Sequence, residues 1–255
     1  MATNSVVSAI RVLETVAERQ PIGLSELARE VGLPKSTVQR CLLTLQDVGW
    51  CRSSSQQPTR WSLTYRAFSV GNSAGGTGSL RELALPLLSE LQIRTGETIH
   101  LAAPDERELV LLERVDTAHR LRAFLPLGER IVMHASATGQ AFLAASPDDD
   151  VTSYLDGGLT ARTPYTVTDP DELLRTLAAV RERGYSINVE GLSVGITALG
   201  AAVTVGGRPV GAISVSGPTS RMTPDTFDEH GRAVQEAAHR ISAEVTASGR
   251  TVGER

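Results

Sequence analysis

The chain has 255 residues, of which 41% are hydrophobic, and 25 basic against 29 acidic residues leave a formal net charge of -4. Two cysteines, with no Cys-x-x-Cys or His-x-x-His pair, argue against a zinc site, and we expect neither a metal nor a cofactor. Because no signal peptide or long apolar run is visible, we expect a cytoplasmic protein with no membrane segment.

The first predicted elements are three helices. Apolar residues at helical spacing predict a helix over residues 5–18. Two shorter helices follow within residues 24–43, and Gly32 stands between them, where the chain needs a positive φ. This is the pattern of a helix-turn-helix, whose second helix enters the major groove of DNA, with an ordinary helical hairpin as the alternative.

The outward face of the second motif helix carries side chains that bind phosphates or base edges. Ser25 and Ser36 are placed to cap the two motif helices, and Pro34 stands just ahead of the second. Together with two arginines of the hairpin that follows, the predicted DNA-contacting residues are Ser25, Lys35, Ser36, Thr37, Gln39, Arg40, Thr44, Arg52 and Arg60.

A β-hairpin wing is predicted after the motif. Gly49 ends the helix, Trp50 begins a short extended run, and residues 61–63 return as a second strand. We expect Trp50 and Trp61 to form a cross-strand pair that packs the wing onto the helices, rather than a platform for stacking bases. Residues 1–63 hold seven basic and five acidic residues, so a basic N-terminal part precedes an acidic body, which suits a DNA-binding unit with a separate control domain.

A glycine-rich segment separates the two parts of the chain. Residues 69–79 contain four glycines, which disfavour a helix by about 1 kcal/mol each relative to alanine. We therefore expect a winged helix-turn-helix domain over residues 1–66, a glycine-rich linker over 67–79 and a second domain over 80–255. A helix that starts at Leu80 and contains Pro86 opens this second domain.

The second domain mixes strands and helices in a pattern typical of the α+β class, an antiparallel sheet flanked by helices. A capping box over residues 169–172 opens a helix that ends at Gly184, and Thr223 with Pro224 caps the last helix. The remaining predicted elements are a hairpin of residues 98–102 and 109–113, strands over 121–125, 185–189, 199–205 and 209–216, and a helix over 137–145.

Several local strings in this order resemble the IclR family of bacterial transcriptional regulators: those at residues 32–37, 81–84, 94–101, 134–139, 183–185 and 214–218. The resemblance covers nearly the whole chain. It implies a winged helix domain joined to a GAF-like effector-binding domain. It also implies a repressor of a catabolic operon that acts as a dimer or a dimer of dimers. Its partners would be double-stranded operator DNA and a small-molecule effector.

The resemblance also implies an effector pocket formed by three segments. Thr138 and Gly139 lie at a helix start, where free backbone N–H groups bind carboxylate or carbonyl oxygens. Ser214 and Ser216 alternate on a strand, so both face the same ligand. The expected effector-binding residues are His134, Ala137, Thr138, Gly139, Asn188, Leu192, Gly195, Ala198, Leu199, Ser214 and Ser216.

This sequence departs from the family pattern at the pocket. The family usually has lysine in place of Gln140 and an acidic residue in place of Asn188, and the loop over residues 191–200 carries no charge. We therefore expect an aromatic or mostly apolar effector with one polar end, over which this loop closes, rather than a small keto acid. His100 is interpreted as a satisfied buried histidine, and Arg122 and Arg130 as surface residues.

Two other functions remain open. Residues 191–195 match G-x-S-x-G, the nucleophile elbow of α/β-hydrolases, which would make Ser193 a nucleophile with His230 or His239 as its base. That motif needs a strand-to-helix turn in a parallel sheet, whereas the residues after it here predict another strand, so we expect no catalytic residues. The second alternative is a DNA-binding repressor that responds to no ligand.

Overall fold

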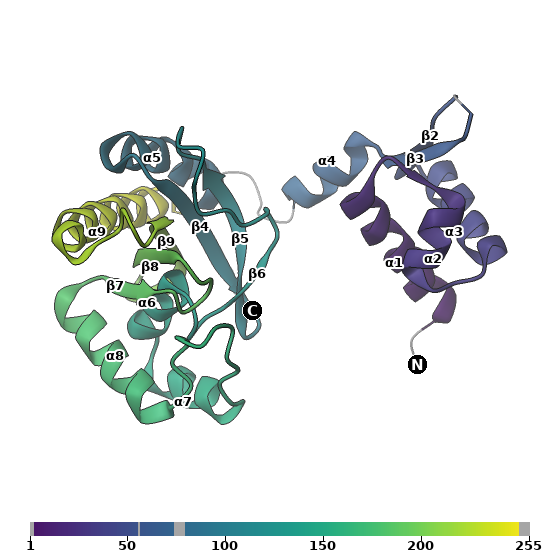
Figure 1. Cartoon of the computed structure of the whole chain (residues 1–255). Coiled ribbons are helices and arrows are strands. Elements are labelled where there is room, and N and C mark those ends of the chain that lie inside the picture. Colours follow the sequence, from purple (N-terminus) through teal and green to yellow (C-terminus); the bar gives the residue numbers. More distant parts are fainter. Residues whose placement is uncertain (1–2, 56, 74–79, 250–255) are drawn as a thin grey trace. The chain divides into compact units, whose positions relative to one another are not determined.

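The computed structural model describes residues 3–55, 57–73 and 80–249. The chain divides into two compact units, Met1–Thr77 and Gly78–Arg255 (Figure 1). No helix within the described ranges is both long and apolar enough to cross a membrane.

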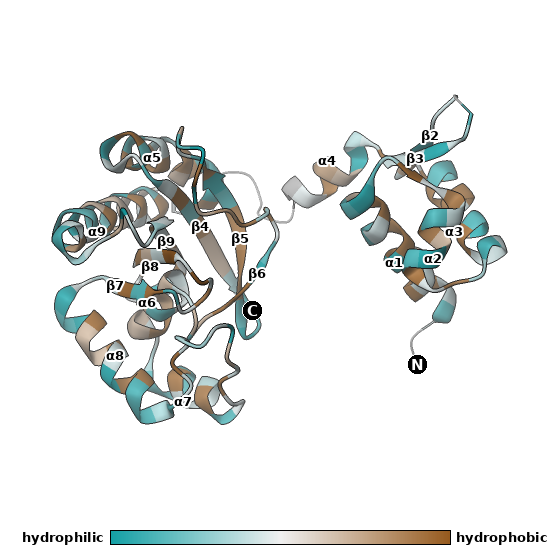
Figure 2. Cartoon of the chain, in the orientation of Figure 1, coloured by the Kyte–Doolittle hydropathy of each residue, from teal (hydrophilic) through white to brown (hydrophobic). Residues whose placement is uncertain are grey.

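The first unit is built from helices α1 (Asn4–Arg19), α2 (Leu24–Val31) and α3 (Lys35–Asp47), and a small sheet. The sheet has the order β1-β3-β2, with β1 at Ile22–Gly23, β2 at Cys51–Ser53 and β3 at Arg60–Leu63, and both pairings are antiparallel. Hydropathy alternates along the helices (Figure 2), and their apolar sides meet in one core that includes Val12, Val16, Leu27, Val38 and Leu42. This arrangement confirms the helix-turn-helix and its wing.

The two predicted serine caps are wrong. Helix α2 begins at Leu24 with Gly23 as its N-cap, and α3 begins at Lys35 with Pro34 as its N-cap, so Ser25 and Ser36 lie inside the first turns. A capping side chain must come from the residue just before the helix, where the backbone is still extended. Gly32 has a φ of 70°, as the turn between the helices requires.

The two tryptophans pack against the same core, but they are not cross-strand partners. Trp61 is buried and pairs with Ser53 of β2 and Ile22 of β1. Trp50 precedes β2 and is half-buried against the core, with the Arg66 guanidinium 6.0 Å from its ring centroid. The predicted packing role is therefore confirmed and the predicted pairing is wrong.

Helix α4 (Tyr65–Ser73) occupies the first part of the segment that we expected to be a non-helical linker. It continues through Gly71, so one glycine is not enough to stop it, because a single glycine costs only about 1 kcal/mol. The other three glycines of this segment lie among residues 74–79, outside the described residues.

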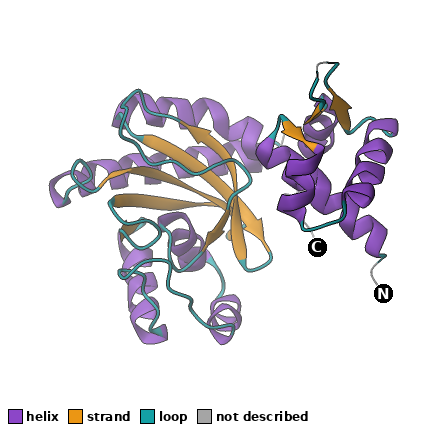
Figure 3. Ribbon diagram, turned by 45° about the vertical axis from the view of Figure 1, so that its right-hand side comes forward, coloured by secondary structure: helices purple, strands orange, loops and turns teal. Residues whose placement is uncertain are grey.

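The second unit contains a six-stranded sheet of order β6-β5-β4-β9-β8-β7 with antiparallel pairings throughout (Figure 3). The strands are β4 (Thr98–Asp105), β5 (Glu108–Val115), β6 (Arg130–Val132), β7 (Ser186–Val189), β8 (Ile196–Val205) and β9 (Arg208–Pro218). The helices are α5 (Leu80–Thr95), α6 (Ala137–Ala145), α7 (Asp148–Asp156), α8 (Pro170–Arg183) and α9 (Pro224–Ala247). The predicted α+β class is confirmed.

Helices cover both faces of the sheet, and alternation along the strands decides which side chains meet which layer. Helices α5 and α9 pack on one face, against Ile99, Leu199, Ile213 and other apolar residues. Helices α6, α7 and α8 pack with the other face, in a second core that includes Ala102 and Ala212.

Local signals placed most of the helix ends correctly in this unit. Asp169 caps α8 by accepting a 2.8 Å hydrogen bond from the Glu172 N–H, and Gly184 ends the helix with a φ of 87°. Helix α6 has the predicted bounds. Thr223 is the N-cap residue of α9, but its side chain makes no capping hydrogen bond.

The predicted strand over residues 121–125 is wrong, and β6 forms at Arg130–Val132 instead. In the 121–125 segment the carbonyls of Leu121 and Leu125 accept hydrogen bonds from arginine side chains rather than from a neighbouring strand. Helix α7, with three aspartates in its first turn, was not predicted.

Candidate nucleic-acid interface and ligand cavity

The exposed face of α3 carries most of the predicted DNA-contacting side chains. Lys35, Ser36, Gln39 and Arg40 are exposed, while Val38, Cys41, Leu42 and Leu45 of the same helix are buried in the core. Thr37 is half-buried, and the exposed Thr44 donates its hydroxyl to the Arg40 carbonyl at 3.0 Å. A helix with one buried side and one polar, cationic side can lie in a major groove without losing its packing.

The two wing arginines differ in their freedom to contact DNA. Arg60 donates from Nη1 to the Pro21 carbonyl at 2.9 Å and lies 3.8 Å from the Glu26 carboxylate. Arg52 is exposed on the neighbouring strand and has no such partner within the described part of the chain. Arg52 is therefore the freer of the two to reach a phosphate.

Both cysteines of this unit are unpaired and buried. Burial raises the pKa of the Cys51 thiol to about 11, so it stays protonated at neutral pH. Across residues 3–55, 57–73 and 80–249, no group of three or more His, Cys, Asp or Glu side chains is placed to hold a metal ion.

The second unit contains a cavity of about 50 Å³ on the α6 side of the sheet. Its wall is formed by residues of strands β4, β6, β7, β8 and β9, the start of α6, the loop before β8 and the segment between β5 and β6. No Asp, Glu, Lys or Arg belongs to the part of the wall that the structure describes: His100, Ala123, Phe124, Leu125, Ile131, Ser136, Ala137, Thr138, Asn188, Leu192, Ser193, Ile196, Ala198, Ser214 and Ser216.

Close backbone packing holds the start of α6 at the cavity. A Cβ on Gly139 would lie 2.1 Å from the Met133 Cα, so only glycine fits there. Ser186 donates its hydroxyl to the Ala137 carbonyl at 2.7 Å from strand β7. The Ser136 side chain caps α6 by accepting a 3.0 Å hydrogen bond from the Gly139 N–H. Gly139 is thus a packing residue whose N–H is already used, and it is not among the residues that line the cavity.

Ser214 and Ser216 lie together at the cavity, as their alternation on a strand predicted. Their hydroxyl oxygens are 3.1 Å apart, and Nδ1 of His100 is 3.2 Å from the Ser216 oxygen. His100 is buried, and its Nε2 has no hydrogen-bond partner within the described residues. Burial, with a smaller contribution from the Arg114 charge, lowers the pKa of His100 to about 4. The histidine that we expected to be satisfied is therefore only half satisfied, and it is also part of the wall.

Three further predicted pocket residues do not belong to the wall. His134 is held by Tyr154, whose hydroxyl is 2.7 Å from Nδ1, and by the Thr160 carbonyl 3.0 Å from Nε2. Burial lowers the pKa of this imidazole. Leu199 points to the α5 and α9 face because it is one residue from Ala198 on the same strand. Gly195 is exposed, with a φ of 80°.

The loop before β8 is anchored by hydrogen bonds to its backbone. The Asn188 side chain accepts from the Gly191 N–H at 3.1 Å, and the Thr166 hydroxyl donates to the Gly191 carbonyl at 2.6 Å. Leu192 and Ser193 then line the cavity. Because residues 191–195 lead into an antiparallel strand, β8, they lack the strand-to-helix turn that a nucleophile elbow requires.

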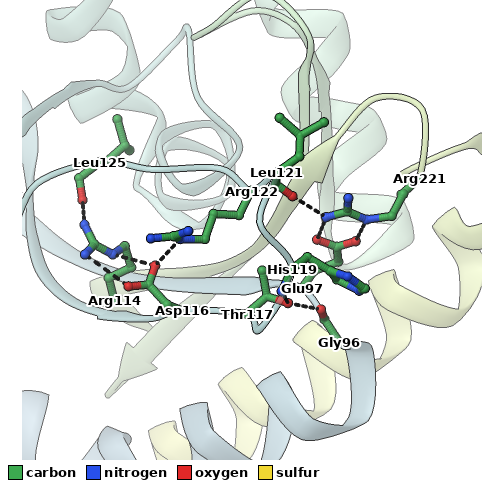
Figure 4. A network of polar contacts seen from close by, with 10 residues as sticks. All are labelled: Gly96, Glu97, Arg114, Asp116, Thr117, His119, Leu121, Arg122, Leu125 and Arg221. Atoms are coloured by element: carbon green, nitrogen blue, oxygen red, sulfur yellow. Dashed lines mark hydrogen bonds and ion pairs between the residues drawn. The ribbon is translucent and has the colours of Figure 1, made fainter.

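Residues 116–129, here called the strap, connect β5 to β6 and form one side of the cavity through Ala123, Phe124 and Leu125. Figure 4 shows the arginines that bind it. Arg114 donates to the Leu125 carbonyl and pairs with Asp116 at 2.9 Å, and Arg221 donates to the Leu121 carbonyl at 3.0 Å. Sequence reasoning missed the strap, since its contacts come from residues distant in the chain.

Arg122 and Arg130, which we expected on the surface, lie outside the cavity wall. Arg130 forms ion pairs with Asp105 and Glu108, and Nε of Arg122 is 3.4 Å from the Asp116 carboxylate.

Comparison with known proteins matches both units of the chain to domains of transcriptional regulators. Residues 5–54 match the IclR helix-turn-helix domain, and residues 76–243 match the domain described as bacterial transcriptional regulator IclR C-terminal. The chain is 36% identical to the transcriptional repressor IclR of Escherichia coli over 243 residues, 93% of this chain and 88% of that protein. It is 35% identical to the acetate operon repressor of Salmonella typhimurium, with the same shares covered.

Solved structures agree with this likeness. The Thermotoga maritima IclR structure matches with a TM-score of 0.83 at 26% identity and covers 95% of this chain and 99% of its own. An IclR homolog from Microbacterium hydrocarbonoxydans, solved in complex with 4-hydroxybenzoate, matches with a TM-score of 0.82 at 25% identity and the same shares.

Proposed function

Because the chain belongs to the IclR family of bacterial transcriptional regulators, we propose that it represses a catabolic operon and that an aromatic or mostly apolar effector with one polar end controls its operator binding. The effector occupies the cavity between α6 and the sheet. The observation that carries this proposal is the wall itself, which has no charged side chain among its described residues.

The wall favours an apolar body with a single polar group. A small keto acid has little apolar surface beside its carboxylate and would gain little from an apolar wall, whereas an aromatic compound also buries its ring. Phe124, Leu125, Ile131, Leu192 and Ile196 offer apolar contact, while the serine hydroxyls of β9 can donate to or accept from one polar end. The relative bound to 4-hydroxybenzoate supports an effector of this kind.

The operator-binding surface in this proposal is the exposed face of α3 with Arg52 of the wing. The first unit has a small basic excess, so one copy makes few phosphate contacts and two copies on a palindrome bind better.

Exposed apolar side chains support a homo-oligomer: Tyr65 is 87% and Phe68 68% exposed on α4, and Val6 and Ile10 are exposed on α1. Sedimentation of the free protein as a monomer would contradict this assembly.

The effector class is tested with an operator selected from a pool of random duplexes. Gel shifts and thermal unfolding are measured with 4-hydroxybenzoate and with pyruvate. We expect 4-hydroxybenzoate alone to raise the melting temperature and to change operator affinity, by a coupling of about 1–3 kcal/mol. Ser216→Ala should weaken this response, and His239→Gln, on the exposed side of α9, should leave it unchanged.

The other outcomes decide between the alternatives. A response to pyruvate alone would refute the effector class while leaving the regulator intact. Operator binding that no compound in a broad metabolite panel alters would favour the ligand-independent repressor.

A further inference from the structure

The cavity is too small for the effector that it is proposed to hold. It measures about 50 Å³, whereas an engineered protein cavity that takes up benzene has about 150 Å³. A ligand with an aromatic ring therefore requires part of the wall to move. The strands and α6 are held by sheet hydrogen bonds and close backbone packing, so the movable parts are the strap and the loop before β8.

The strap is fixed at its two ends, to the residue after α5 at one end and to strand β5 at the other. At one end the Thr117 hydroxyl donates to the Gly96 carbonyl at 2.5 Å. At the other end the Gly128 N–H donates to the Leu111 carbonyl at 2.8 Å, and Leu111 donates to Glu129 at 3.0 Å. Both ends therefore act as fixed points, and only the middle of the strap can swing.

The middle of the strap depends on arginine side chains. Between residues 118 and 127, the backbone groups that hydrogen-bond to described residues outside the strap are the carbonyls of Leu121 and Leu125. Their donors are Arg221 and Arg114, and the Arg114 guanidinium also stacks 4.1 Å from the centroid of the Phe124 ring. No sheet hydrogen bond would be broken if these two contacts were released.

A buried carboxylate orients Arg221. Glu97 accepts from Nε and Nη2 of Arg221 at 2.5 and 2.7 Å, and its side chain is only 6% exposed. This bidentate contact holds the guanidinium in one plane. The second hydrogen of Nη2 can then be donated to the Leu121 carbonyl. Glu97 also stands two residues after the end of α5, the first helix of this unit.

We propose that Arg221, oriented by Glu97, and Arg114 are positioning residues that hold the strap closed over the cavity, and that a ring-sized effector enters when these contacts to Leu121 and Leu125 are released. Opening would expose little more of three large apolar side chains of the strap, because Leu121, Phe124 and Leu127 are already 66%, 58% and 56% exposed. This inference rests on the proposed function only in taking the cavity as the effector site.

The test measures access to Ala123, which is 3% exposed and lines the cavity from the strap. In an Ala123→Cys background, a thiol reagent reacts only when the strap opens, and the two native cysteines are buried and serve as the blank. Because Arg221→Gln alone would leave a buried carboxylate unpaired, the variant is Glu97→Gln with Arg221→Gln. Arg240→Gln on α9, which breaks an exposed 2.6 Å ion pair with Glu90 of α5, is the matched control.

We expect the double variant to speed labelling by about tenfold or more, as local opening becomes easier, and the control to leave it unchanged. Hydrogen exchange of the double variant with Ala123 retained provides a second measurement. Peptides of residues 118–127 should exchange faster than in the native protein, while those of β4 and β9 should not. Unchanged labelling and unchanged strap exchange would overturn the proposal.

A separate arm keeps the two proposals distinguishable. Saturating 4-hydroxybenzoate should slow labelling in the Ala123→Cys protein. If the double variant opens the strap but this compound gives no protection, the role of Arg221 in holding the strap closed is supported and the proposed effector class fails.

Discussion

Stability should fall in mild acid because His100 cannot take up a proton in the native protein. Burial and the nearby Arg114 hold its pKa at about 4, against about 6.5 in an unfolded chain. Between these two values the unfolded chain binds the proton and the native protein does not, so protons favour unfolding. This loss of stability is absent above about pH 6.5 and grows as the pH falls towards 4.

The shift sets the magnitude. A difference of roughly 2.5 pKa units corresponds to about 3 kcal/mol of unfolding free energy. The charged neighbours that act on this imidazole are Arg114 and Asp116, which act in opposite directions, so burial remains the main cause.

Urea unfolding between pH 4 and 7.5 measures the effect by comparing the native protein with His100→Leu. The variant should lose less stability over this range, by about 3 kcal/mol, whereas the exposed His239→Gln should follow the native curve. Parallel curves for the native protein and His100→Leu would refute the reasoning, since they would mean that this imidazole is protonated in the folded state.

The other predictions concern packing, capping and DNA binding. Gly139→Ala should destabilise the second unit by about 3 kcal/mol or more, measured by thermal unfolding, because its Cβ would overlap the Met133 backbone; native-like stability would show that α6 can shift away. Asp169→Ala should cost about 1 kcal/mol through the lost cap of α8, and Asp169→Asn should restore most of it. Arg40→Ala should weaken operator binding in gel shifts without changing the effector-dependent thermal shift, and an unchanged operator affinity would contradict the orientation assigned to α3.

The sequence by itself determined the local structure and the class of the protein. Gly32 and the apolar spacing around it specify the helix-turn-helix, and Asp169 and Gly184 set the two ends of α8. These features depend on residues within a few positions of one another, where capping and periodicity act. The alternation of Ser214 and Ser216 is local in the same sense, so their shared face could be predicted.

Only the tertiary structure decided which residues form the cavity and what closes it. The pairing of β4 with β9 brings His100 against Ser216 across 116 positions, and Arg221 reaches Leu121 across 100. Leu199 faces away because the register of β8 assigns neighbouring residues to opposite faces. Gly139, which the family resemblance placed in the pocket, packs on the Met133 backbone instead. Such contacts depend on strand register and long-range packing, which no local pattern records.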